Sequence, residues 1–201
     1  MKKKKEMDIV FLLDRSGSMS GLEQDTIGGY NSYIEKQKNN KMNTKVTTVL
    51  FDNQYELLHD RVNISEISKI TEKEYYVRGC TALLDAIGIT INNLDKKVKD
   101  NKVLFIITTD GLENASKEYN KTKIKELISN HPTWEFLYIG ANIDSYTEGE
   151  SIGIRKSNIA NYSKSKQGTQ ALFECVSDAS ISMYCDNTIK SSWKTKLENT
   201  K

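Results

Sequence analysis

The chain has 201 residues, enough for one domain with a sizeable core and short for two. Hydrophobic residues make up 37% of it and charged residues 28%, a balance that is typical of globular proteins and excludes a disordered chain. With 29 Lys and Arg against 27 Asp and Glu, the formal net charge is +2, so no nucleic-acid partner is expected. The basic run Lys2–Lys5 is interpreted as part of a solvated tail, residues 1–6.

The sequence contains no segment typical of a membrane span or a signal peptide. No apolar run approaches the roughly 18 residues of a membrane helix, and the first run, residues 9–13, is too short for a signal peptide. The three cysteines, Cys80, Cys175 and Cys185, are odd in number and lack metal-ligand spacing. Reduced thiols of this kind indicate a cytoplasmic protein.

The first half of the chain predicts a buried strand, a helix, a strand pair and a second helix. Asp8–Leu13 is a nearly continuous apolar run, and an amphipathic helix is expected at Leu22–Lys38. Lys45–Asp52 and Tyr55–Asp60 are joined by so short a turn that they must pair antiparallel, at one edge of the sheet. At Leu83–Val98 the apolar residues alternate in spacing between three and four, which indicates a strongly amphipathic helix.

The second half repeats the alternation of strands and helices. Its predicted elements are a strand at Val103–Thr108, a helix around Ile124–Ile128, a strand at Trp134–Ile139, a short helix, an edge strand near Asn158–Tyr162, and a helix at Gln167–Tyr184. Such a pattern predicts a three-layer α/β/α fold, Rossmann-like, with a mostly parallel central sheet and one antiparallel edge strand. One domain is expected over residues 7–186, followed by a polar tail, 187–201, with Trp193 exposed.

A carboxylate and two hydroxyls follow the first predicted strand. Asp14 comes at its end, and Ser16 and Ser18 come next, with Gly17 permitting a tight turn between them. The loop after a parallel strand lies at the carboxyl edge of the sheet, where open α/β folds bind ligands. The N-terminus of the following helix would favour an anion there, so this loop alone does not make a cation site.

The same edge is expected to receive a second carboxylate and a third hydroxyl. Asp110 follows the strand at Val103–Thr108, and Thr81 precedes the helix at Leu83–Val98. Carboxylates and hydroxyls are hard oxygen donors, which suit Mg²⁺, with Mn²⁺ and Ca²⁺ as alternatives. The predicted metal site consists of Asp14, Ser16, Ser18, Thr81 and Asp110.

A simpler interpretation needs no metal. Asp14, Ser16 and Ser18 could cap the helix that follows them, because Ser and Asp are common at helix N-termini. Thr81 could cap the next helix, and Asp110 with Gly111 could form an ordinary turn. The coincidence of three such loops at one edge of the sheet favours the metal site over this interpretation.

These three segments resemble von Willebrand factor A-type (vWA) domains. Residues 14–19 (DRSGSM) match the D-x-S-x-S signature of that family, residues 79–88 (GCTALLDAIG) resemble its threonine loop, and residues 108–114 (TTDGLEN) resemble its second aspartate loop. The segments occur in the family's order, and the resemblance covers residues 7–186. It implies a vWA fold with an intact metal-ion-dependent adhesion site, in a stand-alone member of bacterial or phage type.

The resemblance also implies a role for each site residue. Ser16 and Ser18 would ligate the ion directly, Thr81 directly or through water, and Asp14 and Asp110 through water. One position would remain for a carboxylate of a partner. The expected function is therefore metal-dependent binding of an Asp or Glu of another protein, without enzymatic activity. Arg15, Met19 and Glu113 are expected at the partner-binding rim.

The alternative is a metal-dependent hydrolase or phosphotransferase that uses the same site. Ser16 stands where phosphatases place a second aspartate, two residues after the nucleophile, and the chain has no P-loop sequence. His59 and His131 are expected away from the site, so no histidine base is available. The sequence therefore favours the binding module.

Overall fold

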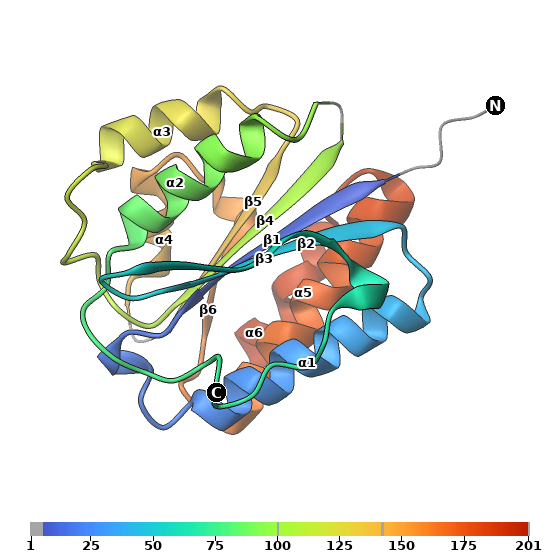
Figure 1. The fold of residues 1–201 in the computed structure, drawn as a ribbon, viewed down its shortest axis with the longest axis horizontal. Helices are drawn as coiled ribbons and strands as arrows, with labels where there is room; N and C mark the ends of the chain where they lie inside the picture. The colour runs from blue at the N-terminus through green and yellow to red at the C-terminus, as the bar shows by residue number, and fades with distance from the viewer. Residues whose placement is uncertain (1–5, 100, 142, 201) are drawn as a thin grey trace.

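The structure, a computed structural model, describes residues 6–99, 101–141 and 143–200. The basic run at Lys2–Lys5 lies outside these residues. A central sheet separates two layers of helices (Figure 1). The strands of the sheet are β1 (Met7–Asp14), β2 (Thr44–Phe51), β3 (Tyr55–Asn63), β4 (Lys102–Thr109), β5 (Glu135–Ala141) and β6 (Ile159–Tyr162).

The sheet has the order β3-β2-β1-β4-β5-β6, so β1 and β4 are neighbours near its middle. Only β3 runs antiparallel to its neighbour, because the turn from β2 is too short for a crossover. The other pairs are parallel, with Leu13 opposite Thr108 and Asp14 opposite Phe51. This register brings the ends of β1 and β4 together at the carboxyl edge.

Two groups of helices cover the two faces of the sheet (Figure 1). One group is α1 (Glu23–Asn39), α5 (Lys166–Asp186) and α6 (Thr195–Asn199); the other is α2 (Leu83–Asp95), α3 (Lys121–Ser129) and α4 (Ser145–Ser151). The period-two alternation of β1 serves both layers: Phe11 packs into the core under α1 and α5, and Leu12 packs into the core under α2. Every residue of β1 is buried.

The C-terminal segment differs from the expected loose tail. Residues 195–199 form α6, and Trp193 is only 5% exposed. The indole Nε1 of Trp193 donates a hydrogen bond to the carbonyl of Ser157 at 2.9 Å, and Leu197 joins the same core. Burial of these two apolar side chains, four residues apart, holds the segment on the domain. The expectation of an exposed Trp193 is therefore wrong.

The fold class expected from the sequence is confirmed: a mostly parallel six-stranded sheet with one antiparallel edge strand, covered by helices on both faces. The expected helices and strands are all present, with ends shifted by a few residues. None of the helices in the described ranges is both long and apolar enough to cross a membrane.

Candidate metal centre

The site lies where β1 and β4 end and α2 begins. Asp14 is the last residue of β1, Asp110 follows the last residue of β4, and Thr81 precedes α2 by two residues. The structure thus brings together all five residues that the sequence predicted as metal ligands. None of them is more than 6% exposed, apart from Ser18 at the surface.

Asp14 is a fully buried carboxylate held by neutral donors. Its Oδ1 accepts a hydrogen bond from the backbone N–H of Ser16 at 2.7 Å, and its Oδ2 accepts one from Thr109 Oγ1 at 2.6 Å. Burial raises the pKa of Asp14 from 3.8 to about 6, these hydrogen bonds lower it, and the negative charge of Asp110 adds a small rise. A nearby cation would relieve this strain on the ionised form.

The two serine hydroxyls link the loop after β1 to the end of β4. Ser16 Oγ and Ser18 Oγ lie 3.0 Å apart, and Ser18 Oγ donates a hydrogen bond of 2.5 Å to Asp110 Oδ1. Asp14 and Asp110 are therefore joined through short contacts across two strands. The side chains of Asp14, Ser16, Ser18 and Asp110 thus form one polar cluster.

Gly111 marks the point on which the three hydroxyls converge. A Cβ at this position would lie 2.7 Å from Thr81 Oγ1, 3.0 Å from Ser18 Oγ and 3.6 Å from Ser16 Oγ. Any side chain here would fill the space between these oxygens. The hydroxyls predicted to contact an ion thus surround one small space, kept open by a glycine.

Backbone hydrogen bonds fix the threonine loop against the loop after β1. Gly17 N–H donates to the Gly79 carbonyl at 3.1 Å, and Arg78 N–H donates to the Arg15 carbonyl at 2.8 Å. Gly79 has a φ of 67°, and a Cβ there would lie 2.0 Å from Asn53 Oδ1, so only glycine fits. The backbone N–H of Thr81 donates to Asn114 Oδ1 at 2.9 Å, which ties this loop to the loop after β4.

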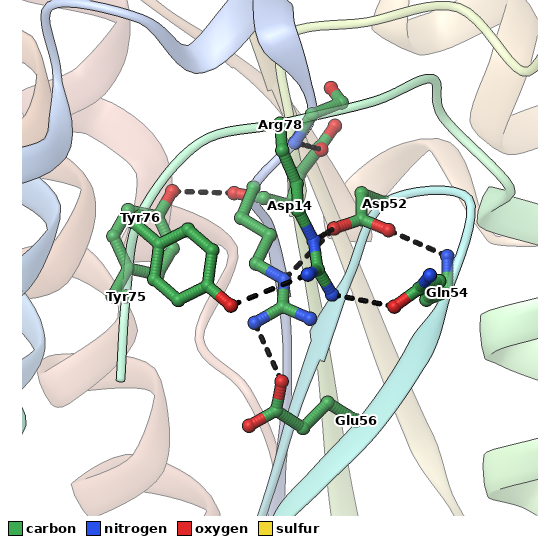
Figure 2. Close-up of polar contacts among 9 residues, drawn as sticks. Asp14, Asp52, Gln54, Glu56, Tyr75, Tyr76 and Arg78 are labelled. Carbon is green, nitrogen blue, oxygen red and sulfur yellow. Dashed lines mark hydrogen bonds and ion pairs between the residues drawn. The ribbon is translucent and has the colours of Figure 1, made fainter. Parts of the chain in front are cut away.

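A buried ion-pair cluster supports the site from the side of β2 and β3 (Figure 2). Asp52 Oδ2 lies 3.1 Å from Arg15 Nε and 2.7 Å from Arg78 Nε, and Asp52 Oδ1 accepts a hydrogen bond from the Gln54 backbone. Arg15 Nη1 also lies 2.7 Å from Glu56. The cluster clamps the residue after Asp14 and the loop before Thr81 to the same turn.

The predicted partner-binding rim is wrong at two of its three positions. Arg15 is 0% exposed because Asp52 and Glu56 draw its guanidinium inward, and Met19 is 3% exposed. Glu113 is half-buried, and its carboxylate accepts hydrogen bonds from the backbone N–H of Leu84 in the first turn of α2 and from those of Ala115 and Ser116 in its own loop. The exposed apolar side chain next to the site is Leu112, 56% exposed.

The hydroxyls of Ser16, Ser18 and Thr81 do not cap helices, contrary to the simpler interpretation of the sequence. α1 begins at Glu23, well after Ser18, and no side chain caps its N-terminus. The N-cap position of α2 is Ala82, also without a side-chain cap, so Thr81 does not fill that role. Since α1 starts away from Asp14, the expected anion-favouring helix end is also not at the site. The hydroxyls of Ser16, Ser18 and Thr81 therefore do not serve as caps of α1 or α2.

Two contacts of the candidate site are not predicted by the sequence. One is that of Thr109, whose hydroxyl donates a hydrogen bond to Asp14. Lys164 places its ammonium 2.8 Å from Asp110 Oδ2 and also hydrogen-bonds to the Ser18 carbonyl. Lys164 follows β6, a strand parallel to β5, and this position at the carboxyl edge could have identified it.

The donor set fits a hard divalent cation. Two buried carboxylates and three hydroxyls supply only oxygen, the preferred donor of Mg²⁺, Mn²⁺ and Ca²⁺. In the described ranges, no three His, Cys, Asp or Glu side chains cluster in a way that could hold a metal. A metal site here would therefore depend on the hydroxyls of Ser16, Ser18 and Thr81 as well as on the two carboxylates.

Comparison with known proteins identifies the fold and not the family. No family model matches the chain, and no curated protein matches it. Among solved structures, proximal thread matrix protein 1 from the mussel byssus is 16% identical, with a TM-score of 0.63, over 87% of this chain and 48% of that one. The pilus adhesin SpaC of Lactobacillus rhamnosus GG is 14% identical, with a TM-score of 0.73, over 90% and 30%.

A further structure of the mussel protein has a zinc-occupied MIDAS motif; it is 17% identical to this chain, with a TM-score of 0.60, over 87% of this chain and 45% of that one. The chain thus spans less than half the length of each of these proteins. At these identities the likeness concerns the arrangement of strands and helices. Together with the mixed sheet and its two helical layers, it shows that the chain has a vWA-like α/β fold.

Proposed function

We propose that this domain is a metal-dependent protein-interaction module that binds a carboxylate of a partner protein. The observation that carries the proposal is the convergence of Thr81, Ser18 and Ser16 on the space beside Gly111. Two buried carboxylates, Asp14 and Asp110, stand directly behind these hydroxyls. Such a cluster of oxygen donors with excess negative charge favours a cation.

Each residue has a distinct role in this proposal. Ser16, Ser18 and Thr81 would contact the ion, preferably Mg²⁺, while Asp14 and Asp110 would orient these hydroxyls and hold water. The ion would supply a positive charge that an Asp or Glu of the partner can coordinate. Because neutral hydroxyls leave most of that charge uncompensated on the open side, the site would select an anionic side chain. Leu112, exposed beside Gly111, offers an apolar contact for the same partner.

The hydrolase alternative has no histidine base among the contacts of this site in the described residues. His59 lies on β3 near Tyr30 Oη, and His131 contacts Asp95 and the carbonyl of Leu127. Neither histidine hydrogen-bonds to one of the five candidate metal ligands. The zinc-occupied motif of the mussel matrix protein and the adhesin among the structural neighbours support the binding proposal.

Ion binding tests the proposal directly. Titration of Mg²⁺ into the wild-type protein, followed by thermal unfolding and calorimetry, should show binding, and Ser16→Ala should lose it because one converging hydroxyl is removed. At an ion concentration ten-fold above the dissociation constant, linkage gives about 1.4 kcal/mol and a rise of about 2–4 °C in Tm. Ser20→Ala, an exposed serine of the same loop, should behave as the wild type.

The same variants test the partner. Capture of a protein from lysate should be lost with EDTA and with Ser16→Ala, and kept with Ser20→Ala. A wild-type protein that responds to neither Mg²⁺, Mn²⁺ nor Ca²⁺ would contradict the proposed metal site. Turnover of a phosphate ester or carboxylate ester that Ser16→Ala abolishes would instead favour the hydrolase.

A further inference from the structure

A lysine side chain from the segment after the edge strand β6 contacts the candidate site. Lys164 lies between β6 and α5, and its Nζ is 2.8 Å from Asp110 Oδ2. The same ammonium hydrogen-bonds to the backbone carbonyl of Ser18. Lys164 thus contacts both the second carboxylate and the loop of the serine hydroxyls, and it brings a positive charge to the place where a metal ion would be held.

The contact with Asp110 is an ion pair and not a directed hydrogen bond. Asp110 Oδ2 is buried, and within the described ranges no group donates a hydrogen bond to it with suitable geometry. The other oxygen, Oδ1, accepts from Ser18 Oγ. A buried oxygen without a donor is costly, so Oδ2 is open to a stronger donor or a cation.

The Lys164 side chain is more exposed to solvent than the Asp110 carboxylate with which it pairs. The Asp110 side chain is 1% exposed, whereas the Lys164 side chain is 28% exposed. A lysine ammonium on its four-carbon chain is a compact point charge with several rotamers, and Lys164 could move into solvent without breaking a buried network. Asp110 has no comparable freedom. The Lys164 ammonium can therefore leave this ion pair, while the Asp110 carboxylate stays in place.

We propose that Lys164 is a built-in competitor of the divalent ion for Asp110. This inference rests on the proposed function. Asp14, Asp110 and Lys164 together carry a net charge of −1, compared with −2 for the two carboxylates alone. Loading of the site then requires Lys164 to leave Asp110 or to remain against the repulsion of two like charges. The competition sets a threshold of ion concentration below which the lysine keeps the site closed.

A purely structural role of Lys164 makes the opposite prediction. If the lysine only positions Asp110 and the Ser18 loop, its removal would disorder the site and weaken ion binding. If it competes, its removal strengthens ion binding. The sign of the change in dissociation constant therefore separates the two roles.

The experiment is calorimetric titration of Mg²⁺, and in parallel Mn²⁺, into wild type, Lys164→Met and Lys164→Gln. Both variants should bind up to about five-fold more tightly, the change that corresponds to loss of a partly exposed ion pair worth up to about 1 kcal/mol. Lys164→Arg keeps the charge and should not bind more tightly than wild type. Lys166→Met, two residues further along, is the matched control and should match wild type.

The outcomes distinguish this inference from the proposed function. Equal or weaker binding in both neutral variants, while the wild type binds, overturns the competition alone. An equal gain in Lys166→Met also overturns it, because the gain would then follow from net charge. Absence of binding in every variant overturns both proposals. Tighter binding in both neutral variants than in the wild type and in Lys166→Met supports the competition. Thermal unfolding in EDTA verifies that each variant is folded.

Discussion

Asp14 and Asp52 are both completely buried, but Asp52 has cationic partners and Asp14 has neutral ones. Asp52 has two permanent cations, the guanidinium groups of Arg15 and Arg78, at 3.1 and 2.7 Å (Figure 2). Asp14 has neutral partners, a backbone N–H and the hydroxyl of Thr109, and burial raises its pKa to about 6. Arginine side chains of the chain itself neutralise Asp52, whereas no cationic side chain contacts the Asp14 carboxylate in the described residues.

This difference separates a carboxylate that the chain itself neutralises, Asp52, from one that we propose to act in ion binding, Asp14. A buried charge without a compensating partner costs free energy, and a ligand that supplies the missing charge recovers it. Asp52 can gain little from an added cation, whereas Asp14 can gain much. Both side chains have the same exposed fraction, so their charged or neutral partners, and not their burial, distinguish the proposed site from the ion-pair cluster.

The largest effect is expected from Asp52→Asn. Removal of this charge leaves the buried guanidinium of Arg15 with Glu56 as its acidic partner, and we expect a loss of about 3–5 kcal/mol in the free energy of unfolding. Urea denaturation measures it. The loss should be the same in EDTA and in Mg²⁺, because Asp52 is not a proposed metal ligand.

Asp60→Asn is the control for this change. Asp60 pairs with Lys97 on the surface, where both side chains are more than 40% exposed, so we expect a loss of less than about 1 kcal/mol. A loss in Asp52→Asn as small as in Asp60→Asn would mean that the cluster in Figure 2 does not hold the site.

When metal is removed, Asp14→Asn should raise the free energy of unfolding, whereas Asp52→Asn should lower it. A pKa of about 6 in place of 3.8 means that the folded state binds a proton more readily, so stability falls as pH rises from about 4 to about 6. Above pH 6 the ionised Asp14 carboxylate lowers the free energy of unfolding by about 3 kcal/mol. The neutral amide of Asp14→Asn has no such destabilising effect. In EDTA at pH 8 the variant should be more stable than the wild type, by up to that amount.

The advantage of Asp14→Asn should disappear as pH falls below 4, where the carboxyl is protonated in both states. With Mg²⁺ at pH 8 the difference should shrink or reverse, because the wild type gains the binding energy and the variant does not. A variant that is less stable than the wild type in EDTA at every pH would show that Asp14 is stabilising without an ion, as Asp52 is.

Of the three site variants, Gly111→Ala is expected to change the free energy of unfolding least. It should nevertheless abolish the stabilisation by Mg²⁺. The added methyl would lie 2.7 Å from Thr81 Oγ1, so this hydroxyl must rotate away, at a cost of about 1 kcal/mol. The roughly 1.4 kcal/mol stabilisation expected from ten-fold excess Mg²⁺ should be absent. Thermal unfolding with and without Mg²⁺ measures both values.

Gly28→Ala is the matched control, because a Cβ at this position of α1 meets no atom within 4 Å. It should stabilise the helix by about 0.5–1 kcal/mol and keep the full ion response. An undiminished response in Gly111→Ala would show that the ion does not use the space between the three hydroxyls.

The sequence predicted the fold and the gathering of the site because both depend on local patterns. Apolar runs of strand length defined β1 and β4, and the loop after each parallel strand had to meet at one edge. Asp14 and Asp110 were therefore predictable from position alone. The hydroxyls of Ser16, Ser18 and Thr81 followed from the same position at strand ends and a helix start, and the resemblance of the three loops to vWA domains agreed with this set.

The features that sequence reasoning missed depend on contacts between distant segments. The burial of Arg15 requires Asp52 and Glu56, on another strand pair, and no local pattern distinguishes it from an exposed arginine. Lys164 reaches Asp110 across 54 positions of the chain. Trp193 is surrounded by polar residues in sequence, and only the fold shows the core that it enters. Charge pairing and tertiary packing decided these cases.

The two backbone hydrogen bonds between residues 15–17 and 78–79 have a consequence for the speed and cost of ion capture. They make the serine loop and the threonine loop one rigid body, so that Ser16 and Thr81 need not find each other when an ion arrives. Little conformational entropy remains to be lost on that side of the site. The slow step of loading would then be the departure of one lysine side chain, a rotamer change rather than a movement of the fold.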